Sequence, residues 1–255
     1  MTKDYIYNID TAKPLFDRHG ESIMDIIFAT GNEHKMHEIR AIMEGFPGRI
    51  ISMKEAGITA DIEETGTTFE ENALCKARGL YQLLHAPADM PAAKNHENSP
   101  LSKTALKSSS FLLPVQELQQ AIILADDSGL VIDALNGEPG IFSARYLGHD
   151  TPYDQKNKMI IERLADVPDE KRSARFVCAI AAVFPDGSEE CVCGVYEGRI
   201  AHAPKGTNGF GYDPIFYLPE LSVTDAELTD TEKNKISHRG QALRAMKKLL
   251  FERSH

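Results

Sequence analysis

The feature that most constrains the fold is an unbroken apolar run at 121–125, Ala-Ile-Ile-Leu-Ala, which ends at Asp126-Asp127. A short run of this kind is typical of a strand buried on both faces. A second run, at 26–29, leads into a Thr-Gly-Asn turn, after which apolar residues recur every three or four positions from Met36 to Phe46. This spacing predicts a strand, a tight glycine turn and a helix at the start of the folded region.

Further elements follow the same two periodicities. Helices are predicted at 69–84, capped by Thr67 or Thr68, and at 153–164 and 238–253. Strands are predicted at 174–184 and 191–200, joined as a hairpin by a Pro-Asp-Gly turn, with a short strand at 215–216. The alternation of strands and helices indicates an α/β fold with an antiparallel portion in its second half.

Two segments lack these patterns. Residues 1–24 show no clear periodicity and are predicted to be an irregular N-terminal extension to a single catalytic domain at 25–253. Residues 85–110 are rich in Pro, Ala, Ser, Asn and Lys, which favours a surface-loop insertion at about 86–118, closed by a short helix near 115–120.

Composition excludes several functional classes. The net charge of −10 argues against a general nucleic-acid binder, which needs an excess of Lys and Arg. No stretch approaches the roughly 20 apolar residues of a membrane span, and residues 1–21 lack a signal-peptide core, so no membrane partner and a cytoplasmic location are expected. Cys178, Cys191 and Cys193 lie in apolar, strand-like segments and are predicted to be buried free thiols.

The turn before the first helix is a candidate phosphate site. Backbone N–H groups at a helix N-terminus bind anions, and Gly31 lets the chain approach a phosphate closely. Thr30 and Asn32 add hydrogen-bonding side chains, and Lys35 adds a positive charge. Taken alone, the same residues are equally consistent with an ordinary helix cap followed by an exposed lysine.

Acidic pairs form a second candidate site. Asp126 and Asp127 end a buried strand, where desolvating a charge is costly unless it is paired or binds a metal. We therefore favour a Mg²⁺ site in which one carboxylate polarises water, although an Asp-rich turn remains the plainer alternative. Taken alone, Glu63-Glu64 is best interpreted as a solvated acidic turn, and it joins this site only if it folds against Asp127.

Cations and aromatic residues form a third group. Each of Lys76, Arg145, Lys233, His238 and Arg239 taken singly is best explained as surface decoration. The Phe-Gly-Tyr-Asp run at 210–213 is different, because rings beside a flexible glycine and a carboxylate suit stacking and edge recognition of a nucleobase. A glycine-rich turn with core aromatics is its equally weighted alternative.

Five segments taken together resemble the inosine triphosphate pyrophosphatase family, also called Ham1-like or dITP/XTP pyrophosphatases. They are FATGNEHKMHEI, EETGTTFEENALCKA, LADDSGLVIDALNGEPGIFSARYLG, KGTNGFGYDPIF and AELTDTEKNKISHRGQAL. The resemblance implies a two-lobed α/β fold around a long mixed β-sheet with flanking helices, active as a homodimer. It also implies Mg²⁺-dependent hydrolysis of ITP, dITP and XTP, in preference to ATP or GTP, to the monophosphate and pyrophosphate.

The resemblance also implies a role for individual residues. Asp127 would be the general base or the metal-linked activator of water. Glu63 and Asp127, with Asp126 as a further candidate, would hold Mg²⁺. The residues expected to bind substrate are Thr30, Gly31, Asn32, Glu33, His34, Lys35, Lys76, Ser128, Phe210, Gly211, Tyr212, Asp213, Lys233, His238 and Arg239.

Two rival functions compete with this interpretation. A Maf-like nucleotide pyrophosphatase shares the chemistry but prefers other bases, and the complete segments at 210–213 and 237–239 count against it. A non-catalytic nucleotide sensor would keep the cleft without turnover. The intact acidic pairs at 63–64 and 126–127 argue against a sensor, since it has no need to activate water.

Overall fold

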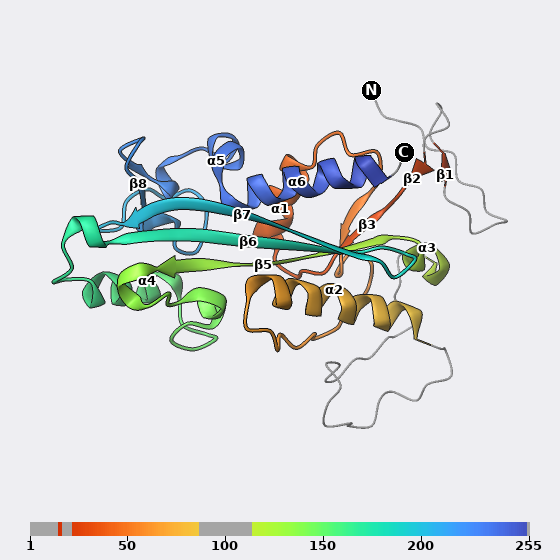
Figure 1. The fold of residues 1–255 in the computed structure, drawn as a ribbon, viewed down its shortest axis with the longest axis horizontal. Helices are drawn as coiled ribbons and strands as arrows, with labels where there is room; N and C mark the ends of the chain where they lie inside the picture. The colour runs from red at the N-terminus through yellow and green to blue at the C-terminus, as the bar shows by residue number, and fades with distance from the viewer. Residues whose placement is uncertain (1–14, 17–21, 87–113, 254–255) are drawn as a thin grey trace.

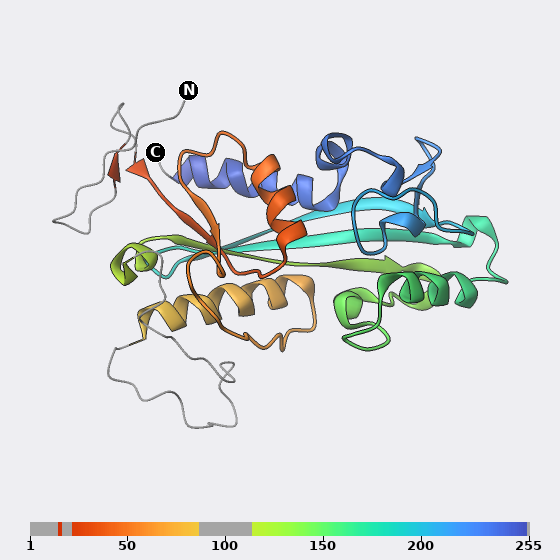
Figure 2. The ribbon, with the colours of Figure 1, turned by 180° about the vertical axis from the view of Figure 1, so that it is seen from behind.

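A seven-stranded mixed sheet runs along the molecule in this computed structural model, which describes residues 15–16, 22–86 and 114–253 (Figures 1 and 2). The strand order is β4-β3-β5-β6-β7-β8-β9. Strand β3 is parallel to β4 and β5, and the remaining pairs are antiparallel. The strands are β3 (Ile26–Phe28), β4 (Ile50–Ser52), β5 (Ile122–Ile132), β6 (Ser173–Val183), β7 (Glu189–Ile200), β8 (Phe216–Leu218) and β9 (Val223–Thr224).

Helices cover both faces of the sheet (Figures 1 and 2). On one face lie α1 (Glu33–Ile42), α5 (Asp230–Ile236) and α6 (His238–Arg253), and on the other lie α2 (Phe69–His85) and α4 (Tyr153–Arg163). The short α3 (Val115–Gln119) packs against α2. Five short 3₁₀ helices also lie among the described residues: η1 (Asp133–Leu135), η2 (Gly140–Arg145), η3 (Asp169–Lys171), η4 (Asp213–Ile215) and η5 (Asp225–Glu227).

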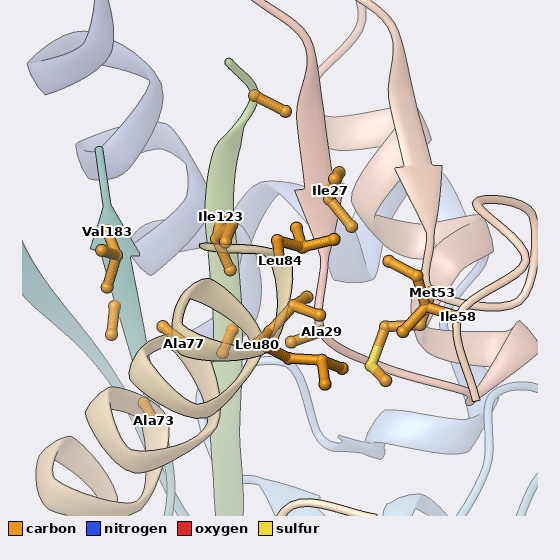
Figure 3. Close-up of a cluster of buried hydrophobic side chains, with 14 of the residues drawn as sticks. Ile27, Ala29, Met53, Ile58, Ala73, Ala77, Leu80, Leu84, Ile123 and Val183 are labelled. Carbon is orange, nitrogen blue, oxygen red and sulfur yellow. The ribbon is translucent and has the colours of Figure 1, made fainter. Parts of the chain in front are cut away.

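The end of the sheet that contains β4 and β3 is here called the first lobe, and the alternation of side chains along β3 gives it two cores, one on each face. Ile27 faces α2 and packs with Leu80 and Ile123 in the cluster shown in Figure 3. Its neighbours Ile26 and Phe28 face the opposite side and pack with residues of α1 and α6. Because all three β3 residues are fully buried, each contributes about 1.5–3 kcal/mol, and the strand is held from both faces.

A third core forms the second lobe at the other end of the sheet. It joins Ile132 of β5 and Phe176 of β6 to Ile160 of α4 and Phe216 of β8. The long strands β5, β6 and β7 carry the sheet from one lobe to the other (Figure 1). The predicted two-lobed α/β fold around a mixed sheet is therefore confirmed.

The strand that carries the aspartate pair is longer than predicted. Residues Asp126 and Asp127 lie in the middle of β5, whereas the apolar run suggested that the strand ends before them. The reason is tertiary, because β6 pairs with β5 all the way to Ile132. Strand β3 pairs with β5 only as far as Leu124, so one edge of β5 is free of β3 where the aspartates begin.

Most other elements agree with the prediction, and the two further corrections concern the N-terminal extension and the cysteines. The hairpin of β6 and β7 is confirmed. The extension was predicted to be irregular, but β1 (Leu15–Phe16) and β2 (Ser22–Ile23) form an antiparallel pair within it. Residues 1–14 and 17–21 of the extension lie outside the described residues. Most of the predicted insertion, 87–113, also lies outside them. Of the three cysteines predicted to be buried, Cys178 is buried, whereas Cys191 is half-buried and Cys193 is exposed.

Among the residues that the structure describes, no helix is both long enough and apolar enough to cross a lipid bilayer.

Candidate functional site

A cleft of about 550 Å³ opens where β3 ends beside β5. Its walls come from both lobes, from the turn before α1 at one end to the loop before η4 at the other. Fourteen of the predicted site residues line it: Thr30, Gly31, Asn32, Lys35, Lys76, Asp127, Ser128, Phe210, Gly211, Tyr212, Asp213, Lys233, His238 and Arg239. Four others do not, namely Glu33, His34, Glu63 and Asp126.

The turn between β3 and α1 presents a helix N-terminus to the cleft. Asn32 is the N-cap of α1, and its side-chain oxygen accepts a hydrogen bond from the backbone N–H of Lys35 at 3.1 Å. The hydroxyl of Thr30 accepts a hydrogen bond from the N–H of Asn32 at 3.2 Å. A Cβ on Gly31 would meet no atom within 4 Å, so open space lies beside this backbone. The turn is therefore both a helix cap and a potential anion site.

Asp126 points to the α1 and α6 face of the sheet. Its carboxylate is 2.8 Å from Lys35 Nζ and 3.4 Å from Arg239 Nη2, and only 1% of the residue is exposed. Burial alone would raise its pKa, but the charges of Lys35, Arg239 and Lys76 hold the pKa well below its usual range. Asp126 is thus an ionised anchor for two cations that line the cleft, although Asp126 itself is not part of the lining.

Asp127 points to the opposite face, because successive residues of a strand alternate. Its two oxygens lie 3.3 Å from Lys76 Nζ and 3.1 Å from Asn72 Nδ2, which donates a hydrogen bond. Burial raises the pKa of Asp127, and the charge of Glu64 raises it further, against the opposing charge of Lys76. A carboxylate oriented in this way suits proton transfer from a bound water.

The acidic pair before α2 contributes one side chain to the cleft. Glu64 lines it, 2.8 Å from Lys76 Nζ and 3.0 Å from Arg145 Nη1, whereas Glu63 is exposed and lies outside it. The prediction placed a metal ligand at Glu63, but the side chain that reaches Asp127 through Lys76 is Glu64. In the described part of the chain, no three His, Cys, Asp or Glu side chains lie close enough together to hold a metal by themselves.

The loop before η4 forms the other end of the cleft. The N–H of Phe210 donates to Asp213 Oδ2 at 2.8 Å, and the same oxygen is 2.6 Å from Lys233 Nζ. Lys233 and Arg239 lie over the Phe210 ring at 5.1 and 5.7 Å from its centroid. Tyr212 donates from its hydroxyl to the carbonyl of Ser143 at 2.8 Å, which ties the loop to η2.

His238 is buried in the wall between these two ends. Its ring stacks on Phe176 with centroids 4.8 Å apart and an interplanar angle of 13°. Burial and the charges of Arg239 and Lys233 hold the pKa of His238 well below its usual value. The ring is therefore neutral at neutral pH and can donate or accept a single hydrogen bond at each nitrogen.

Two predicted residues lie at the rim. His34 stacks against Phe210 with ring centroids 5.8 Å apart, which brings α1 of one lobe to the loop of the other. Glu33 forms an exposed ion pair with Lys54 at 2.7 Å and is not among the residues that line the cleft. Glu33 can still contribute its backbone N–H at the start of α1.

Comparison with known proteins identifies the family. A model of the Ham1 family matches residues 26–249, which include every segment that lines the cleft. The chain belongs to the Ham1 family. The resemblance noted in the sequence is thereby confirmed.

Relatives in this family match over nearly their whole length. A dITP/XTP pyrophosphatase of Thermoanaerobacter pseudethanolicus is 42% identical over 230 residues, which are 90% of this chain and 98% of the relative. One of Clostridium perfringens is 42% identical over 221 residues, 87% of this chain and 94% of the relative.

Solved Ham1 structures have the same fold. A HAM1 protein from Coxiella burnetii has a TM-score of 0.68 and 37% identity, covering 90% of this chain and all of its own. The Ham1 protein of Staphylococcus aureus has a TM-score of 0.68 and 32% identity, covering 90% of this chain and 99% of its own.

Two further residues that position side chains of the cleft were not predicted from the sequence. Asn72 is fully buried, donates to Asp127 and accepts from the N–H of Gly66 at 2.9 Å, linking the acidic turn to β5. Its spacing of four residues from Lys76 places both on one face of α2, a signal that was available. Glu38 forms buried ion pairs with Lys233 and Arg239, and nothing in the sequence near it indicates this.

The loop geometry predicts a special sensitivity at Gly209, which has a φ of +70°. A Cβ there would lie 2.1 Å from Asp213 Oδ2, whereas at Gly187, with a φ of +80°, the nearest atom is the Tyr81 hydroxyl at 3.5 Å. Both substitutions to alanine carry a backbone cost of about 1–2 kcal/mol. We expect Gly209→Ala to lower the free energy of unfolding in urea by about 1–3 kcal/mol more than Gly187→Ala. Equal losses would show that the Asp213 contact is unimportant.

Proposed function

We propose that this Ham1-family chain is a nucleoside-triphosphate pyrophosphatase that hydrolyses the deaminated purine nucleotides ITP, dITP and XTP to the monophosphate and pyrophosphate. Such hydrolysis removes these nucleotides from the cellular pool. The observation that carries the proposal is one cleft that joins a helix N-terminus, the Asp127 carboxylate and the Phe210 loop. The relatives named dITP/XTP pyrophosphatases support the choice of substrate.

The triphosphate is assigned to the end of the cleft near α1. Backbone N–H groups after Gly31, the α1 dipole and the Lys35 ammonium favour negative charge there. Lys76 and Arg145 face the same space from α2 and η2. Pyrophosphate becomes a good leaving group when such charges neutralise it, so catalysis is mainly positioning and electrostatics.

Asp127 is assigned the removal of a proton from the attacking water. Asn72 and Lys76 hold its two oxygens, so the carboxylate keeps one orientation toward the cleft. The raised pKa of Asp127 improves its strength as a base. Water activated there attacks the α-phosphorus, and the bond to the pyrophosphate oxygen breaks.

Magnesium dependence is part of the proposal. Glu64 and Asp127 face one cleft on either side of Lys76, and the charge of Glu64 raises the cost of ionising Asp127. This donor set fits Mg²⁺, which is usually held by one or two carboxylates together with substrate phosphates. When bound, the ion would supply neutralisation of the phosphate charge.

The nucleobase is assigned to the Phe210 end. An aromatic ring with Lys233 and Arg239 beside it offers a stacking face and side chains that can only donate hydrogen bonds. A purine 6-oxygen accepts such bonds, whereas the 6-amino group of ATP leaves the donors unpaired. The preference over GTP, which carries the same 6-oxygen, rests on the naming of the relatives.

We also propose that the enzyme is a homodimer in the cytoplasm. The family resemblance supports the dimer, and the location follows from that of the nucleotide pool on which the proposed activity acts.

A substrate panel tests the function. Purified protein is incubated with Mg²⁺ and ITP, dITP, XTP, ATP or GTP, and the phosphorus products are separated by chromatography. We expect pyrophosphate and monophosphate from the deaminated purines, with kcat/KM for ATP lower by about 100-fold because a buried donor is left unpaired. Release of orthophosphate, or equal turnover of ATP and ITP, would contradict the proposal.

The role of Asp127 is tested by Asp127→Asn, which keeps the size and the contact with Asn72 but removes the basic carboxylate. We expect turnover of ITP to fall by about 100-fold or more while nucleotide still binds. Turnover is measured by pyrophosphate release and binding by calorimetry with ITP. Activity near the wild-type level would place the base elsewhere.

The two adjacent glutamates provide a matched test of the metal site. Because Glu64 faces the cleft and Glu63 is exposed, Glu64→Gln should raise the Mg²⁺ concentration needed for half-maximal activity by about tenfold. Glu63→Gln should leave this concentration within about twofold. The reverse pattern would restore Glu63 as the ligand, and activity in excess EDTA would remove the metal from the proposal.

A further inference from the structure

A chain of buried ion pairs lies beneath the Phe210 loop, formed by α1, β5, η4, η5, α5 and α6. Its links are six contacts of 4 Å or less between charged side chains. The members, here called the Lys233 cluster, are Lys35, Glu38, Asp126, Asp213, Asp225, Lys233 and Arg239. Within this cluster four carboxylates face three cations, so one negative charge is left unbalanced.

Asp225 is the carboxylate that lacks stabilisation. Both its oxygens are buried without a hydrogen-bond partner among the described residues, and its side chain is 0% exposed. Asp213, in contrast, accepts from the N–H of Phe210 and from Lys233. An ionised buried carboxylate without hydrogen bonds is strongly disfavoured, so the unbalanced charge is removed most easily by a proton on Asp225.

The electrostatics of the cluster agree with this assignment. Burial raises the pKa of Asp225 to about 7, and the charge of Asp213 adds to the rise against that of Lys233. The groups that face Asp225 are Asp213 on η4, Lys233 on α5, Glu38 on α1 and Tyr196 on β7. Burial and the charge of Asp225 raise the pKa of Tyr196, so its hydroxyl stays protonated.

Lys233 is the shared partner through which Asp225 reaches the cleft. Its Nζ lies 2.6 Å from Asp213, 3.2 Å from Glu38 and 3.6 Å from Asp225. The nearest of these, Asp213 Oδ2, also holds the backbone of Phe210. A negative charge on Asp225 therefore competes with Asp213 for Lys233 and weakens the contact that fixes the loop.

We propose that Asp225 is a positioning residue for the nucleobase. When Asp225 is protonated, Lys233 stays paired with Asp213, and this pairing holds the Phe210 loop in its binding geometry. This inference rests on the proposed function, because it concerns the end of the cleft to which the base is assigned. Asp225 lies behind Asp213 and Lys233 and does not line the cleft, so it acts on substrate only through them.

The kinetic test compares wild type with Asp225→Asn, which mimics the protonated acid at every pH. We expect the wild-type KM for ITP to rise by up to about tenfold between about pH 6 and 8, while kcat changes little. This pH range is the one in which a single group with a pKa near 7 loses its proton. In Asp225→Asn this rise should be absent. Ionisation of the substrate itself affects both proteins equally, so the ratio of the two KM values is the quantity compared.

Asp230→Asn is the matched control, since it makes the same chemical change on the exposed surface of α5. Its KM should follow the wild-type pH profile. If wild type hydrolyses ITP but the ratio of the Asp225→Asn and wild-type KM values is constant with pH, the inference is overturned and the proposed function stands. If wild type hydrolyses no deaminated purine nucleotide, the proposed function fails instead.

A stability measurement tests the ionisation without any substrate. Asp225 binds its proton more tightly in the folded protein than in the unfolded chain, so its contribution is complete below about pH 4 and is lost as pH rises through about 7. The melting temperature of Asp225→Asn relative to wild type should therefore increase from about pH 5 to pH 8. A difference that does not change with pH would overturn the inference.

A third measurement uses only the wild-type protein, so it can be made even if Asp225→Asn does not fold. Carbon-detected NMR of side-chain carboxyl groups should show one buried carboxyl with a midpoint near pH 7, and the Phe210 ring signals should shift with the same midpoint. A Phe210 signal that is insensitive to this titration would overturn the link between Asp225 and the loop.

Discussion

The antiparallel ladder between β5 and β6 is the constraint on which the site depends. It pairs residues 123–132 with 174–183 and carries the sheet from the first lobe into the second without a break. Because side chains alternate along a strand, the consecutive residues Asp126 and Asp127 must point to opposite faces. The edge of β5 is free of β3 at this point, so Asp127 gains access to the cleft while Asp126 remains beneath it.

Opposite faces give the two aspartates different electrostatic environments. Asp126 is nearly fully buried between Lys35 and Arg239, which hold it ionised and bring α1 and α6 onto the sheet. Asp127 shares Lys76 with Glu64, and its pKa is raised instead of lowered. Buried charges of this kind are stable only when they are paired, and the cations that pair them here come from three separate helices, α1, α2 and α6.

Much of the site could be predicted from the sequence because its motifs are local. The turn before α1, the aspartate pair and the 210–213 loop are each contiguous, and the structure places most of them around one cleft. The errors arose where the outcome depends on long-range pairing. The apolar run ended before Asp126, yet β6 extends the strand beyond it. In an acidic pair, sequence alone does not indicate which side chain turns inward, and here Glu64 does so through Lys76 and Arg145.

The sequence by itself determined the α/β class, the family and the local chemistry of each motif, since periodicity and contiguous residues carry that information. Only the tertiary structure decided how the charges are partnered. Glu38 forms ion pairs with Lys233 and Arg239, which follow it by about 200 positions in the sequence. Asp225 joins the same cluster, although no local pattern in the sequence indicates it. The physical reason is that the ionisation of a buried group depends on every charge and dipole around it, and those neighbours are assembled by the fold.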